Sequence, residues 1–181
     1  SALLAFASPA HADWPTDPAV GVLVSGTTAN EQDVHVVSDG AAGMIVAWSD
    51  NRSVVERTRL QRVSAFGERL WPQAGVTVAS QVVQQDMPRI VGDGAGGVFV
   101  AWRDARTAPH TRVYAQHFGP NGQFQWAPDG VLAAADTLDM EPYGLVPDGA
   151  GGVLIVMIGR VPAAPSLPLY VQRVASDGSL P

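Results

Sequence analysis

Two short segments of the sequence place an aspartate two residues before an arginine. Asp50 and Arg52 lie in Ser-Asp-Asn-Arg, and Asp104 and Arg106 lie in Arg-Asp-Ala-Arg. Residues two apart on an extended segment point the same way, so each pair could clamp a polar ligand. The competing interpretation, which we favour, is a loop-fixing ion pair or a cap on backbone amides. The aligned third segment, residues 158–161, reads Ile-Gly-Arg-Val, and either interpretation tolerates that break.

Three glycine-rich segments begin with an aspartate: Asp39, Asp93 and Asp148 each open an Asp-Gly-Ala-x-Gly sequence. Aspartate and loop carbonyl oxygens suit calcium, but each segment offers one carboxylate where a dedicated calcium loop offers several. Glycine accepts the positive φ of tight hairpin loops, so we expect turns. The histidines have no metal-ligand spacing, and no nucleophile elbow, phosphate loop or zinc-protease motif occurs. The sequence therefore indicates no metal, no cofactor and no catalytic residue.

Composition narrows the class of protein. The formal net charge is −6 and the basic residues are scattered, which argues against a nucleic-acid groove. No apolar stretch approaches the roughly 20 residues of a membrane-spanning helix. No long segment has helical periodicity, and the many glycines, prolines and valines favour short strands.

The strongest pattern is an internal repeat of about 55 residues. Each glycine-rich segment is followed by an apolar run: MIVAW, VFVAW and VLIVM. Further on, LQRV aligns with AQHF and VQRV, and a Gly-x-x-x-Trp segment ends at Trp71 and at Trp126. We divide residues 13–181 into three units of about 14–70, 71–125 and 126–181.

Each unit is expected to form four antiparallel strands. In the second unit we place them at Pro88–Gly92, Val98–Arg103, Arg112–Phe118 and Val131–Ala134. The second strand is apolar at consecutive positions, so both its faces should be buried. Such a sheet needs a similar sheet on each side, as in the blades of a β-propeller. The predicted fold is all-β, with three four-stranded antiparallel blades.

Three blades make an incomplete propeller, because propellers typically have four to eight. The favoured explanation is that the chain is a fragment of a longer propeller. In the alternative, residues 20–24 supply an outer strand to another blade or to a partner chain, and a homodimer completes a ring of six.

The propeller arrangement gives the charged residues a second interpretation. The loop after each second strand would share a face with the links between blades, where we place Asp33, Asp86 and Glu141 just before each inner strand. With Asp50, Arg52, Asp104 and Arg106 they could ring a central funnel suited to a sugar or a cation. These residues are the candidate ligand-binding set.

Two resemblances support the fold. The segment Tyr114–Trp126, YAQHFGPNGQFQW, resembles the tryptophan-docking turn of quinoprotein-type propellers in its Gly-x-x-x-Trp tail. The aspartate and threonine of that motif are absent, so the resemblance implies packing roles for Trp71 and Trp126 and no quinone cofactor. Over residues 14–181 the pattern is similar to β-propeller repeats of large secreted bacterial proteins of unassigned function.

The N-terminus indicates export. Residues 1–12, SALLAFASPAHA, resemble the end of a signal peptide with small residues before a cleavage site. We therefore expect a secreted, periplasmic or cell-surface protein. The leading hypothesis is a non-catalytic propeller segment that binds glycan or protein or serves as a structural module. The alternative is a glycosidase- or lyase-like propeller enzyme with its active site on the funnel face.

Overall fold

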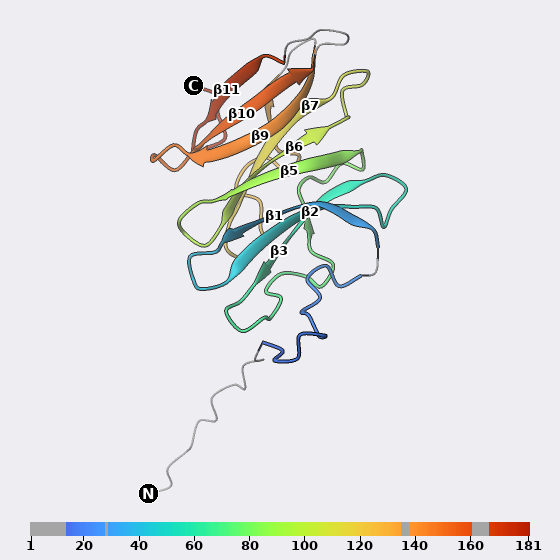
Figure 1. Cartoon of the computed structure of the whole chain (residues 1–181). Coiled ribbons are helices and arrows are strands. Elements are labelled where there is room, and N and C mark those ends of the chain that lie inside the picture. The colour runs from blue at the N-terminus through green and yellow to red at the C-terminus, as the bar shows by residue number, and fades with distance from the viewer. Residues whose placement is uncertain (1–13, 28, 135–137, 161–166) are drawn as a thin grey trace, which may run out of the picture.

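This computed structural model describes residues 14–27, 29–134, 138–160 and 167–181, and within these ranges the chain forms strands, turns and loops but no helix. The strands make three separate antiparallel sheets, which follow one another along the chain (Figure 1). The all-β, antiparallel prediction is confirmed. The proposed signal-peptide remnant, residues 1–12, lies outside the described residues.

Two sheets have four strands, each in the order of the sequence. The first sheet comprises β1 (Glu31–Ser38), β2 (Met44–Asp50), β3 (Arg57–Val63) and β4 (Val76–Thr77). The second comprises β5 (Gln85–Gly92), β6 (Val98–Asp104), β7 (Arg112–Phe118) and β8 (Val131–Ala134). The strands predicted for the second unit agree with β5 to β8, except that β5 begins three residues earlier, at Gln85, and β6 extends to Asp104.

The third sheet has three strands in the described residues, where four were expected. It comprises β9 (Asp139–Pro147), β10 (Val153–Arg160) and β11 (Leu169–Val174). After β11 the amide of Gly178 donates to the carbonyl of Ala175, which closes a turn, and no strand follows through Pro181. Pro181 cannot donate to β11, because proline has no N–H.

The second sheet lies between the other two (Figure 1). On one face of β6, Val98, Val100 and Trp102 pack in a cluster with residues of the first sheet. On its other face, Phe99 and Ala101 pack with residues of the third sheet. The prediction that a second strand is buried on both faces is therefore confirmed for β6. The first strands also meet, because β5 lies against both β1 and β9.

Candidate functional site

The aspartate of each glycine-rich segment closes its own hairpin. One oxygen of Asp39, Asp93 and Asp148 accepts the amides two and four residues further on, at 2.7–2.9 Å. The other oxygen accepts from a side chain of the third strand, namely Arg62, His117 and Arg173 respectively. Burial opposes ionisation of Asp39, but these bonds outweigh it and lower its pKa. The carboxylates thus serve the turns, and in the described residues no three His, Cys, Asp or Glu side chains gather as a metal site.

The first candidate pair, Asp104 and Arg106, forms a buried polar cluster at the end of β6. Asp104 is fully buried and accepts from the main-chain amide and Nε of Arg106 at 2.9 and 2.8 Å. Its second oxygen accepts Nη2 of Arg106 at 2.7 Å and the indole N–H of Trp102 at 2.8 Å. The guanidinium lies 3.8 Å from the ring centre of Tyr114. This carboxylate has no face left for a ligand.

The second candidate pair repeats the arrangement at the end of β2. Asp50 is fully buried. It accepts the main-chain amide and Nε of Arg52 at 2.9 and 2.8 Å, and the indole N–H of Trp48 at 3.2 Å. Burial opposes ionisation of Asp50, but the bonds from Arg52 outweigh it and lower its pKa. In both sheets the geometry agrees with the loop-fixing ion pair and not with a ligand clamp.

The buried cluster also connects the first two sheets. Gln85, on β5, donates to Asp104 at 3.3 Å, and its carbonyl oxygen accepts Nε of Arg57, on β3, at 3.0 Å. Arg57 further donates to the carbonyl of Ala79 at 2.8 Å. The charge at the end of β6 is therefore part of the junction between sheets.

Asp86 and Glu141 are brought together by one arginine. Arg103 donates to both oxygens of Asp86 at 2.6 and 2.7 Å, and to Glu141 at 3.2 Å. Arg160 donates to the same oxygen of Glu141 and is half exposed. The hydrogen bonds that Arg103 donates to Asp86 are the main reason that the pKa of Arg103 is raised. This chain of ion pairs links β5 and β6 to β9 and β10, and Asp86 and Arg103 line a small hollow of about 140 Å³.

Asp33 does not join that arrangement. All three candidate carboxylates lie within β1, β5 and β9, not in the links before them. The strand register pairs Gln32 with Ser49, as it pairs Asp86 with Arg103. Gln32, not Asp33, is therefore the counterpart of Asp86. Asp33 occupies a bulge with φ of 52° and its carboxylate accepts from Ser49 at 3.4 Å.

Two buried glutamines, to which the sequence analysis gave no role, hold the fourth strands. Gln61 and Gln116 are fully buried on β3 and β7. The carbonyl oxygen of each accepts the main-chain amide of the tryptophan ten residues later, Trp71 at 3.0 Å and Trp126 at 3.1 Å. Their side-chain amides donate to the next carbonyls, at 2.9 and 2.6 Å. The sequence signal for this role was the glutamine that LQRV, AQHF and VQRV share.

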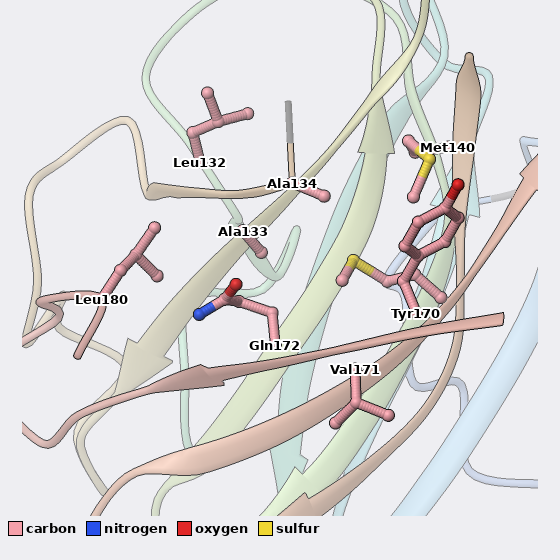
Figure 2. A pocket seen from close by; sticks show the side chains of 9 residues that line it. Leu132, Ala133, Ala134, Met140, Tyr170, Val171, Gln172 and Leu180 are labelled. Atoms are coloured by element: carbon pink, nitrogen blue, oxygen red, sulfur yellow. The ribbon is translucent and has the colours of Figure 1, made fainter. Parts of the chain in front are cut away.

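A larger hollow lies between the outer parts of the second and third sheets. It has a volume of about 300 Å³ and is lined from β8 and β11, with Met140, Met157 and Leu180 (Figure 2). Figure 2 shows Gln172 extending from β11 toward Ala133, while Val171 points the opposite way. Among the described residues this lining carries no charged side chain, so they offer no acid–base pair there.

Within the described residues no helix is long and apolar enough to cross a membrane. No protein-family model, curated protein or solved structure matches the sequence or the fold.

Proposed function

We propose that this chain is a non-catalytic segment of an exported β-propeller whose task is structural, with protein as its binding partner. The observation that carries the proposal is the internal use of its repeated charges. The carboxylates of Asp50 and Asp104 are fully buried in ion pairs, and that of Asp86 is held by both branches of one guanidinium.

The arrangement of the sheets supports the propeller. Each four-stranded sheet is a simple meander, the first strands lie together, and neighbouring sheets pack face to face. The indole N–H of Trp71 donates to the carbonyl of Pro120 at 3.0 Å, and that of Trp126 to Ser176 at 2.9 Å. Each tryptophan thus lies under the corresponding turn of the next sheet, as blades of one ring would require.

A catalytic function has weaker support. A glycosidase needs one carboxyl group that can hold a proton and a second that stays ionised. Asp86 and Glu141 instead share Arg103, which donates to both oxygens of Asp86 and to one oxygen of Glu141, so both carboxylates are engaged in ion pairs.

A protein partner fits the surface better than a glycan. The third sheet exposes several large apolar side chains, including Leu169 and Val171 at 68% and 65% exposure, beside the charged Arg160 and Arg173. Sugars are bound through free polar groups and aromatic platforms, whereas exposed apolar patches favour protein partners. The apolar residues 1–12, with alanines before the expected cleavage point, support export.

The test compares wild type with Asp86→Asn and Glu141→Gln. We expect no hydrolysis or elimination of a panel of chromogenic glycosides and polysaccharides, no binding on a glycan array, and a lower melting temperature for both variants. Turnover by the wild type that Asp86→Asn abolishes, at an unchanged melting temperature, would favour the enzyme instead.

A further inference from the structure

Residues 14–25 lie against the first sheet. Each segment that leads to a fourth strand lies in the same way against the next sheet along the chain. The indole N–H of Trp14 donates to the carbonyl of Ala65 at 2.7 Å. That carbonyl stands two residues before Gly67, as the acceptors for Trp71 and Trp126 stand two residues before Gly122 and Gly178. In each case the glycine lies over the tryptophan ring.

The residues after Trp14 continue the correspondence. Gly21-Val22-Leu23-Val24 aligns with Gly75-Val76-Thr77-Val78, which contains β4, and with Gly130-Val131-Leu132-Ala133, which contains most of β8. Val22 and Val24 are half buried and line a hollow with Val46 and Trp48 of β2. Leu23 also lines this hollow and is 56% exposed. The segment has the sequence and the position of a fourth strand, but no described strand pairs with it.

In the described residues no fourth strand pairs with β11 of the third sheet. In the first two sheets the carbonyls of Arg62 and His117 accept an amide from the segment leading to the fourth strand, at 2.8 Å in both cases. The equivalent carbonyl, that of Arg173, accepts the side-chain amide of Gln172 instead. In the other sheets the corresponding glutamine holds the tryptophan segment. The open edge of β11 therefore offers the donor and acceptor groups that a fourth strand uses.

The outer face of the first sheet and the outer face of the third sheet are also complementary to each other. By register, Val36 on β1 corresponds to Ile90 on β5, and Val146 on β9 corresponds to Val91. Ile90 packs in the junction of the first two sheets and Val91 in the junction of the last two. Val36 and Val146 are instead 60% and 57% exposed. Each outer face therefore matches one side of the junctions that the chain forms between its own neighbouring sheets.

We propose that the third sheet of one chain docks on the first sheet of a second copy, whose residues 14–25 pair with β11 as a fourth strand. The pairs Leu60–Val76 and Ala115–Val131 fix the expected register. Val171 of one copy should lie opposite Val22 of the other. Leu132, the counterpart of Leu23, packs between the first two sheets, so Leu23 should enter the 300 Å³ hollow beside β11.

Two such contacts would close a ring of two copies. The interface is heterologous, because it joins different surfaces of identical chains, and such interfaces form rings when the rotation closes. Two copies supply six sheets, within the four to eight of known propellers. The inference rests on the sheet junctions and does not depend on whether the assembled protein binds glycan or protein.

The test measures the mass of the purified 181-residue chain by light scattering across a dilution series. We expect twice the mass of one chain. Leu23→Asp and Val171→Asp each place a carboxylate in the proposed junction and should weaken association by at least about 30-fold. Val54→Asp, a change at an exposed loop residue that belongs neither to residues 14–25 nor to the third sheet, should leave the mass unchanged. Circular dichroism confirms that each variant is folded.

Mixing the two variants tests the head-to-tail geometry. The Leu23→Asp chain keeps an intact third sheet, and the Val171→Asp chain keeps an intact residue 23, so the mixture can form one wild-type junction. We expect a mixed dimer where each variant alone is monomeric. A monomeric wild type at every concentration, dimers that survive either substitution, or a mixture that stays monomeric would overturn the proposal.

Discussion

Removing the carboxylate of Asp104 should destabilise the protein far more than its place at a strand end suggests. Asp104 is fully buried and Arg106 is 9% exposed, so Asp104→Ala leaves a nearly buried guanidinium without its counter-ion. Breaking a buried ion pair in this way costs about 3–5 kcal/mol of unfolding free energy. The indole N–H of Trp102 loses its acceptor as well. We therefore expect the upper part of that range.

A double-mutant cycle measured by urea unfolding at pH 7 tests the reasoning. Arg106→Ala alone should also destabilise, but the double variant should lose less than the two single losses together, with a coupling of about 1–3 kcal/mol. Asp17→Ala is the control, because Asp17 is exposed and accepts only a nearby main-chain amide. A loss below about 1 kcal/mol for Asp104→Ala, or strict additivity, would refute the buried-pair argument.

The same variant predicts a pH dependence. Burial opposes ionisation of Asp104, but hydrogen bonds from Arg106 and Trp102 outweigh it, so its pKa in the folded state is lowered. A carboxylate with a lowered folded pKa stabilises the fold above its unfolded pKa of about 3.9, and this contribution is lost as the pH falls through the folded value. The gap between wild type and Asp104→Ala should be constant above about pH 5 and shrink below about pH 4. A gap that stays constant down to pH 2 would contradict the assignment.

Three further outcomes follow from the recurring contacts. Gln116→Ala should destabilise by about 1–3 kcal/mol in urea unfolding, because a buried main-chain amide loses its acceptor, while Gln172→Ala should be near neutral in the monomer. Gly122→Ala should lower the melting temperature more than Gly94→Ala: both glycines have positive φ, but a Cβ at Gly122 meets a tryptophan ring at 3.0 Å and one at Gly94 meets nothing. Millimolar calcium or EDTA should leave the melting temperature unchanged, since the oxygens of Asp93 are already bonded. A stabilisation by calcium would reopen the metal interpretation.

The sequence predicted the strands well, because strand formation here follows local signals. Apolar runs bounded by glycine-rich turns located β6 and β7 to within a residue. The buried pairing of Asp50 with Arg52 was the favoured interpretation for the same reason, since both residues lie in one short segment. The third sheet was harder, because whether a fourth strand pairs with β11 depends on chain segments far away in sequence.

The candidate ring was less predictable because it depended on register. Asp86 and Glu141 stand seven residues before Asp93 and Asp148, but Asp33 stands six before Asp39, so it takes the bulge position of Met87 and Gln32 takes the paired position. The link through Arg103 was also missed, since Glu141 lies one repeat away from it. Contacts between sheets leave no trace in the spacing of a single segment.

The third sheet replaces the polar cluster by apolar packing, and the replacement is concerted. The register that pairs Gln85 with Asp104 pairs Met140 with Gly159, and Met157 aligns with Trp102. The junction that would hold the third cluster is thus built from two methionines and a glycine. A polar substitution at one of these positions should therefore destabilise the protein, and a joint substitution at all three should destabilise it less.

Gly159→Asp tests that argument. Its Cβ would lie 2.9 Å from a methyl group of Leu138, and the buried carboxylate would face Met140, which has no hydrogen-bond donor. We expect a loss of about 3–5 kcal/mol in urea unfolding, as for an unpaired buried charge. Adding Met140→Gln and Met157→Trp supplies the two neutral donors of the second sheet, and the hollow beside Met157 leaves room for the indole. The triple variant should therefore be more stable than the single one. If it is equally unstable, the methionines are not the counterpart of the polar cluster, and the third sheet differs for a reason unrelated to the junction.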